Sequence, residues 1–384
     1  MSVRVIAEIV FWSSVVALIY TYAGYPALIA LLSTLRPRRI KCADYTPAIS
    51  VIITAYNEER ALPAKLTNTL ALDYPRDLME VIVASDCSND RTDEIVRSLA
   101  NENVILHRQP QRLGKTAAQN AAVEKARGEI IVFSDATSLY EPEALRRIVR
   151  NFADSSVGCV GGRLIYVDPG DTGIGRGAKG YWGYETFLKR HESLACSLIG
   201  VSGCLYAVRK SAYVPLYNEA CSDFIIATKM MEQGLRTIYE PEAVCTEETN
   251  QRQDNELRMR VRVIAQTFTD LWRHRAMLNP FRGGLYGVQL LSHKVMRYFV
   301  PFFLIAMFAA SGVLARGSVF YRIFFLAQAL GYLCGALSWL LENIGLRSRA
   351  LALPHYLVLT NVASVIAMFQ FLRGERYARW EPIR

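Results

Sequence analysis

The chain contains four long stretches without a single charged residue. Residues 9–35, 298–315, 323–341 and 350–372 lack Asp, Glu, Lys and Arg, whereas residues 36–297 carry charges throughout. A helix needs roughly 20 mostly apolar residues to cross the hydrocarbon core of a bilayer, and each stretch is about that long. The sequence therefore predicts a water-soluble domain joined to membrane-spanning helices. This combination excludes both a simple soluble enzyme and a pure helical membrane bundle.

Basic residues beside these stretches indicate the membrane orientation. Arg36, Arg38 and Lys41 follow the first stretch directly. Because positive residues gather on the cytoplasmic side, we expect the N-terminus outside and the next domain in the cytoplasm. Three further apolar stretches would place the C-terminus outside, whereas the arginines of residues 373–384 favour the inside. Either one segment is re-entrant or the tail departs from this tendency.

These patterns divide the chain into four regions. Residues 1–40 are expected to form an N-terminal transmembrane helix with a basic flank, and residues 41–250 a cytosolic domain. Residues 251–297 are expected to form Arg-rich and amphipathic interfacial helices, and residues 298–384 C-terminal transmembrane helices with a basic tail. The prediction is a multi-pass protein of the cell inner (plasma) membrane.

The charge and the cysteines indicate the partners and the compartment. The net charge of +9 arises from 44 Lys plus Arg against 35 Asp plus Glu. Much of the excess flanks the apolar stretches, so membrane lipid rather than nucleic acid is the expected partner. The eight cysteines include no CxxC pair, and seven lie in the soluble part. This usage suits reduced thiols in a cytosol better than a disulfide framework.

Strand-like and helix-like segments alternate in the first half of the soluble domain. Residues 48–54, 79–85, 104–107 and 129–133 are short apolar runs typical of buried strands, and helical segments separate them. This alternation predicts an α/β fold with a mostly parallel sheet.

Polar residues follow three of the predicted strands. Asn57, Asp86 and Asp135 lie at the carboxyl ends, where ligands bind in such sheets. Each aspartate, like Asp90, also has a plainer interpretation as the cap of the following helix. The convergence of three polar strand ends on one edge favours a binding site.

The ordered series of these segments resembles a known family. Val51–Glu59, Ser85–Thr92, Gly114-Lys115 and Phe133–Asp135 together resemble the family-2 glycosyltransferases, GT-A-fold enzymes that use nucleotide sugars. The apolar frame is similar to the membrane-integrated branch that contains hyaluronan, cellulose and poly-N-acetylglucosamine synthases and exopolysaccharide glycosyltransferases. The resemblance implies a Rossmann-like GT-A domain and transmembrane helices.

The resemblance also implies a donor site. Its nucleotide-sugar-binding residues would be Tyr56, Glu58, Asp86, Asp90, Lys115, Asp135 and Arg262. Asp86 matches the Asp that contacts uracil and ribose in the family. Asp135 matches the first Asp of the D-x-D metal motif, whereas Thr137 replaces the second. One carboxylate can still anchor Mg²⁺ when substrate phosphates and water complete its shell, so Mg²⁺ or Mn²⁺ is the expected cofactor.

Asp223 is the implied catalytic base. It lies in a segment that resembles the family's base-carrying motif, and a carboxylate there can take the proton of an attacking acceptor hydroxyl. The alternative is a cap of the helix expected at residues 224–233. Arg262 matches the Arg of the Q-x-x-R-W motif, but Met259 and Val263 replace its Gln and Trp. The missing Trp argues against long-chain polymerisation.

The acceptor side is expected at Gly203, Cys204 and Trp182. Gly203 and Cys204 belong to a glycine-rich run whose backbone permits close approach to a flat sugar ring, although an ordinary turn is the alternative. Trp182 could stack on a sugar or seat its helix on the membrane.

The resulting hypothesis is an inverting glycosyltransferase of exopolysaccharide or cell-surface glycan synthesis. It would move a sugar from a UDP-linked donor to a lipid-linked or glycan acceptor at the cytoplasmic membrane face, with export or biosynthesis proteins as possible partners. One alternative is a processive polysaccharide synthase that also translocates its polymer. A non-enzymatic alternative is a sugar-nucleotide-sensing membrane scaffold.

Overall fold

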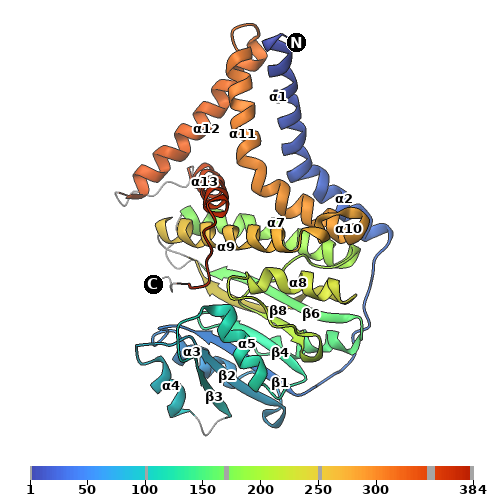
Figure 1. Cartoon of the computed structure of the whole chain (residues 1–384), viewed down its shortest axis with the longest axis vertical. Helices are drawn as coiled ribbons and strands as arrows, with labels where there is room; N and C mark the ends of the chain where they lie inside the picture. Colours follow the sequence, from blue (N-terminus) through green and yellow to red (C-terminus); the bar gives the residue numbers. More distant parts are fainter. Residues whose placement is uncertain (1, 100–102, 168–172, 250–252, 344–350, 381–384) are drawn as a thin grey trace.

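The chain folds into a sheet domain from which long apolar helices project (Figure 1). The structure is a computed structural model, and it describes residues 2–99, 103–167, 173–249, 253–343 and 351–380. Two helices, α7 (Gly173–Ala195) and α9 (Gln253–Arg273), lie between the sheet and the projecting helices. The predicted combination of a soluble domain with membrane-type helices is confirmed.

The sheet has eight strands in the order β3-β2-β1-β4-β7-β6-β8-β5. They are β1 (Ile49–Ala55), β2 (Met79–Ser85), β3 (Val104–Arg108), β4 (Ile130–Asp135), β5 (Leu139–Tyr140), β6 (Val157–Val167), β7 (Tyr206–Arg209) and β8 (Arg236–Glu248). The other helices of this domain are α3 (Leu62–Leu70), α4 (Thr92–Ser98), α5 (Lys115–Lys125), α6 (Ala144–Val149) and α8 (Ser222–Glu232).

The first four strands form the parallel half of the sheet, as the alternation predicts. Strand β1 pairs in parallel with β2 and β4, and β2 pairs in parallel with β3. Every residue of β1 and β2 is buried, which explains their rich content of β-branched residues. Ala55 is level with Ser85, and Thr54 is level with Asp135. The loops after these three strands therefore meet at one edge.

The second half makes the sheet mixed. Strand β7 runs antiparallel to β4 and β6, whereas β8 is parallel to β6 and antiparallel to β5. The β5–β8 pair sets Thr246 opposite Leu139. As a result, the carboxyl end of β8 lies beside the loop that follows Asp135.

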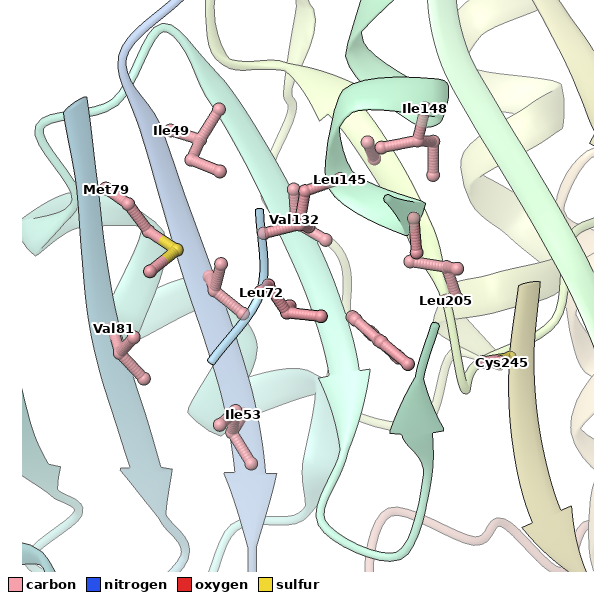
Figure 2. Packing of buried hydrophobic residues seen from close by; sticks show 14 of the residues in the cluster. Ile49, Ile53, Leu72, Met79, Val81, Val132, Leu145, Ile148, Leu205 and Cys245 are labelled. Atoms are coloured by element: carbon pink, nitrogen blue, oxygen red, sulfur yellow. The ribbon is translucent and has the colours of Figure 1, made fainter. Parts of the chain in front are cut away.

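An apolar core beneath the sheet makes this edge rigid. Figure 2 shows strand side chains packed with those of α6 and the segment after α3. The cluster includes Ile49, Ile53, Leu72, Val81, Val132, Leu145 and Ile148. Side chains at the strand ends are thus held by fixed elements, which favours a precise site.

Four helical segments are long and apolar enough to cross a membrane. The first comprises α1 (Val3–Ile19), a π-helical turn and α2 (Tyr25–Leu35), and the second α10 (Pro280–Gln289), the π-helical turn η7 (Leu290–Val295) and α11 (Met296–Leu314). The others are α12 (Val319–Asn343) and α13 (Ala352–Leu372). Helices α1 and α11 pack together, whereas α13 packs on α9 and is seen end-on in Figure 1.

The C-terminal tail returns to the sheet domain. Gln266 of α9 donates a hydrogen bond of 2.7 Å to the carbonyl of Tyr377, and Arg112 donates one to the carbonyl of Trp380. Figure 1 shows the tail that follows α13 running back toward the sheet rather than toward the far end of the apolar helices. Residues 381–384 of the predicted basic tail lie outside the described residues. The tail and the sheet domain are therefore on the same side of the projecting helices, as the arginines indicate.

Candidate active site

A cavity of about 1530 Å³ lies between the sheet edge and the apolar helices. Eight of the residues that the sequence singles out line it: Glu58, Lys115, Asp135, Trp182, Gly203, Cys204, Asp223 and Arg262. The cavity also reaches Tyr22, Tyr298 and Asn361, which belong to the apolar helices. One continuous space thus joins the strand ends to the membrane-type segments.

Three charged side chains converge on Gly203. A Cβ atom added there would lie 3.0 Å from Lys115 Nζ and 3.3 Å from one carboxylate oxygen each of Asp135 and Asp223. Lys115 also forms an ion pair with Asp135. Burial alone would lower the pKa of Lys115, but the charges of Asp135 and Asp223 outweigh it and raise this pKa. The backbone of Gly203 thus forms the floor of a compact charged centre.

Gly203→Ala is expected to lower the transfer rate by about a hundredfold, the typical cost of a displacement near 1 Å in a reacting group. The new methyl group would displace Lys115 or one of the two carboxylates. Gly203 does not have a positive φ, so the backbone accepts Ala and the melting temperature should hold. Gly183→Ala in α7 is the matched control, because its Cβ would meet nothing within 4 Å. Equal rates for the two variants would contradict the prediction.

Asp223 points into the cavity from the first turn of α8. The N-cap of this helix is Cys221, and no side chain makes a capping hydrogen bond there. The plainer interpretation of Asp223 as a helix cap is therefore wrong. The thiol of Cys221 donates to Asp223 Oδ1 over 3.1 Å. A half-buried carboxylate that lines the cavity can accept a proton from a bound hydroxyl.

Asp270 of α9 holds the start of α8, a role that the sequence analysis missed. It is fully buried, accepts the backbone N–H of Cys221 over 3.1 Å, and accepts the hydroxyl of Tyr217. Burial raises the pKa of Asp270 to about 8. In the sequence, Asp270 stands out as an acid on the apolar face of a helix. That pattern predicts a buried carboxylate but does not identify the groups that it binds.

The raised pKa of Asp270 predicts a loss of stability on going from pH 6 to pH 9. The unfolded group has a pKa of about 3.9, so between that value and about 8 the folded state binds more protons and stability falls as pH rises. The melting temperature of Asp270→Asn, measured in detergent by intrinsic fluorescence, should fall less over this interval. Asp77→Asn, at an exposed position, is the control and should follow the parent protein. If the melting temperature changed equally with pH in all three proteins, titration of Asp270 would not cause the loss of stability.

Three potential metal ligands gather beside the charged centre. Ligand atoms of Asp135, Cys204 and Glu247 lie within 4.8 Å of one another. Thr137, at the position of the family's second Asp, donates a hydrogen bond of 2.7 Å to Glu247, and the Cys204 thiol donates one of 3.0 Å. Burial raises the pKa of Glu247, and the charge of Asp135 adds to this effect. Strand β8 therefore brings a second carboxylate close to Asp135.

Glu247 was missed because its partner is remote in sequence. Thr137 marks the missing carboxylate of the D-x-D position, but only the β5–β8 pairing brings Glu247 beside it. Two carboxylates offer the oxygen ligands that Mg²⁺ and Mn²⁺ prefer, and the softer sulfur of Cys204 adds little for these ions. Cys204, expected on the acceptor side, lies next to this carboxylate pair.

Arg262 reaches the same centre from α9. Its guanidinium is buried near Cys221, Asp223 and Asp135, and Nη1 lies 3.5 Å from Gln266 Oε1. Burial lowers its pKa, but an arginine stays charged at any ordinary pH. A permanent cation with planar donors at this position can bind a diphosphate.

Asp86 and Asp90 shape the loops behind the cavity and are not among its lining residues. Asp86 has no exposed surface and accepts the backbone N–H groups of Leu113 and Gly114 over 2.8 and 3.0 Å. It thereby positions the loop that leads into Lys115. Asp90 accepts the N–H of Thr92 over 3.0 Å just before α4, but the N-cap of this helix is Arg91, so the interpretation of Asp90 as the helix cap is wrong. It also accepts the N–H of Glu59 over 3.1 Å, so it ties two strand-end loops together.

Tyr56 is not among the residues that line the cavity, whereas Trp182 is. The guanidinium of Arg112 stacks 3.8 Å above the Tyr56 ring, and the Trp380 ring of the tail meets Tyr56 edge-on at 6.0 Å. Trp182 packs edge-on against Tyr166 of β6 at 5.4 Å and lines the cavity. Its role in stacking on an acceptor sugar stays a prediction.

Comparison with known proteins agrees with this architecture. Residues 50–221 match the sequence profile of glycosyl transferase family 2. The chain is 27% identical over 210 residues to a poly-β-1,6-N-acetyl-D-glucosamine synthase of Staphylococcus aureus, covering 53% of this chain and 50% of that protein. It is 32% identical over 125 residues to the glycosyltransferase AglE of Haloferax volcanii, covering 32% and 41%. The chain thus spans about half the length of the curated relatives it matches.

A solved structure has the same fold over nearly the whole chain. The mannosyltransferase PcManGT from Pyrobaculum calidifontis, solved with GDP-Man and Mn²⁺, superposes with a TM-score of 0.72 at 24% identity. The match covers 94% of this chain and 98% of that one, so it includes the apolar helices. Residues 50–221 therefore match a glycosyltransferase domain of family 2, in a chain with a GT-A-like fold and helices able to cross a membrane.

Proposed function

We propose that this chain is an inverting glycosyltransferase that moves a sugar from a UDP-linked donor to a lipid-linked or glycan acceptor. The observation that carries this proposal is the convergence of Asp223, Asp135 and Lys115 on Gly203 in a cavity that continues to the apolar helices. A base, a metal anchor and a cation meet where an acceptor from the membrane can reach them. Synthesis of an exopolysaccharide or a cell-surface glycan is the process that such an enzyme would serve.

Asp223 is the base in this mechanism. Its carboxylate accepts the proton of the acceptor hydroxyl while that oxygen forms a bond to the anomeric carbon of the donor. The bond from the anomeric carbon to the phosphate oxygen breaks, and the nucleoside diphosphate leaves. Because one base acts and no protein nucleophile intervenes, the anomeric configuration is inverted.

The leaving group requires positive charge. Lys115, which is paired with Asp135, and Arg262 supply it through an ammonium group and a guanidinium. Asp135 and Glu247 would hold Mg²⁺ or Mn²⁺, which neutralises a departing diphosphate when bound. The Mn²⁺ in the mannosyltransferase complex supports a divalent ion in this fold. The UDP assignment comes from the sequence resemblance at Asp86 alone, and Asp86 lies outside the cavity lining. The mannosyltransferase was solved with GDP-Man, so donor choice needs a direct test.

The membrane arrangement follows from the tail. Because residues 375–380 lie on the sheet domain, an even number of crossings must follow this domain. In our proposal α11 and α12 cross the inner membrane, and α13 stays at the interface against α9. The basic flank of the first helix then places the catalytic domain in the cytoplasm.

Purified protein in detergent tests the function directly. A panel of UDP- and GDP-sugars is incubated with Mg²⁺ or Mn²⁺ and lipid extract, and both nucleotide release and product mass are measured. Addition of one sugar to a lipid or glycan from a UDP donor is the expected result. A product ladder would instead indicate the processive synthase, turnover only with GDP-sugars would overturn the UDP assignment, and no turnover with any donor would favour the scaffold.

A further inference from the structure

We propose that the membrane end of the cavity binds the phosphate group of a lipid-linked acceptor through Lys189, Lys294 and Arg297. We call these three residues the basic seat. This inference rests on the proposed function and adds the chemical class of the acceptor. All three residues line the cavity that contains Asp223.

The basic seat lies where the sheet domain meets a membrane-type helix. Lys189 belongs to α7, whereas Lys294 and Arg297 lie in η7 and α11, inside the apolar segment Pro280–Leu314. Charged residues inside such segments are costly and commonly mark a functional site. The position therefore indicates a ligand that approaches from the membrane side.

The basic seat is adjacent to the charged centre. Lys189 Nζ donates a hydrogen bond of 2.9 Å to Ser202, the residue before Gly203. Lys294 Nζ lies 5.6 Å from the ring centre of Phe224, the residue after Asp223. A ligand held between the two lysines would thus have its next chemical group close to the proposed base.

Lys189 is buried, and among the described residues its ammonium group has no carboxylate as a hydrogen-bond partner. Only 7% of its surface is exposed, its ammonium donates to the neutral hydroxyl of Ser202, and it lies 4.9 Å above the Trp182 ring. Burial lowers the pKa of Lys189; Glu185 opposes this shift, and the like charge of Lys294 adds to it. Two ammonium groups that repel each other across a cavity would be stabilised by an anion between them.

The nearby acids hold the basic seat in place. Glu185 accepts from Arg297 Nη1 over 2.8 Å and from His293 Nε2 over 3.1 Å. Glu192 pairs with His293 Nδ1 over 2.7 Å and accepts the hydroxyl of Tyr25. These bonds fix Arg297 and the turn that carries Lys294. Because Glu185 and Glu192 make their hydrogen bonds to these other residues, the ammonium group of Lys189 can bind a ligand.

A phosphate on a lipid fits this arrangement better than the donor diphosphate does. Donor phosphates are expected at the carboxyl ends of β1 and β4, near Lys115 and Asp135. The basic seat adjoins Ser202 and Phe224. The same cavity reaches Tyr22, Thr360 and Asn361 of the apolar helices. A lipid chain among those helices would set its phosphate at the basic seat and its acceptor hydroxyl toward Asp223.

Binding of decyl phosphate tests the basic seat independently of catalysis. Full-length protein in neutral detergent is titrated with decyl phosphate, decanol or inorganic phosphate, and binding is followed by tryptophan fluorescence. Only decyl phosphate should bind well, and Lys189→Met with Lys294→Gln should weaken it by about tenfold or more, as expected for lost charged hydrogen bonds. Arg190→Gln is the matched control, because this exposed cation follows Lys189 on the same helix. If inorganic phosphate or decanol bound as well as decyl phosphate, the proposal that the basic seat binds a lipid phosphate would be wrong.

Kinetics separate this proposal from the proposed function. The double variant should raise KM for a phosphate-linked lipid acceptor and leave KM for the donor and nucleotide release without acceptor unchanged. A raised donor KM would assign these lysines to the donor diphosphate and overturn the proposal. Binding of decyl phosphate without any sugar transfer would support the basic seat and contradict the transferase. If the double variant transferred sugar at the unchanged rate, the proposed transferase function would be supported. The proposed role of the basic seat would then be wrong.

Discussion

Asp223→Asn is expected to lower kcat for sugar transfer by about 10³-fold, within the range that a general base contributes. The amide keeps the shape of the side chain and its place beside the Cys221 thiol, but it cannot accept the proton of the acceptor hydroxyl. Donor binding should persist, because Lys115, Asp135 and Arg262 are intact. Nucleotide release with acceptor and donor affinity are measured on the same preparation.

The control for this variant is Asp254→Asn. Asp254 is an exposed acid in the first turn of α9, so its loss changes the net charge equally without touching the cavity. It should retain the rate of the parent protein. Undiminished release by Asp223→Asn would remove Asp223 from the mechanism and direct attention to another acid of the cavity.

The sequence predicts the part of this site that depends on local patterns. The strand at Met79–Ser85 has the bounds that its apolar run indicates, and the parallel order places Asp135 level with Thr54. The family resemblance identifies Lys115 and Asp223, which meet in the structure. Local sequence suffices here because each residue directly follows a strand or starts a helix.

Contacts between remote segments explain what the sequence does not predict. Thr137 and Glu247 are 110 residues apart and meet only because β8 pairs with β5. The roles of Asp86 and Asp90 depend on backbone N–H groups of neighbouring loops, which residue type alone does not reveal. The side of the C-terminus likewise depends on the contacts of Tyr377 and Trp380 with the sheet domain and α9.

Removal of either carboxylate of the proposed metal pair should have the second large effect. Asp135→Asn would remove the anchor and the ion-pair partner of Lys115, so transfer should fall below detection at any Mn²⁺ concentration. Glu247→Gln should instead raise the Mn²⁺ concentration for half-maximal activity. Even the outer-shell partners of metal ligands contribute 10–100-fold to affinity, so a shift of at least about tenfold is expected. Activity is titrated with Mn²⁺ and Mg²⁺, and Mn²⁺ binding is measured by electron paramagnetic resonance.

Two further variants decide whether Glu247 replaces the second Asp of the D-x-D motif. Glu248→Gln is the matched control, because this exposed neighbour also lines the cavity but is not among the three gathered ligands. Thr137→Asp in the Glu247→Gln background returns a carboxylate to the family position and should lower the required Mn²⁺ concentration again. If Glu247→Gln and Glu248→Gln gave the same Mn²⁺ midpoint, Glu247 would not be a ligand. Rescue by Thr137→Asp would show that the strand β8 carboxylate and the D-x-D carboxylate serve the same ion from two sides, because only the position of the charge differs between them.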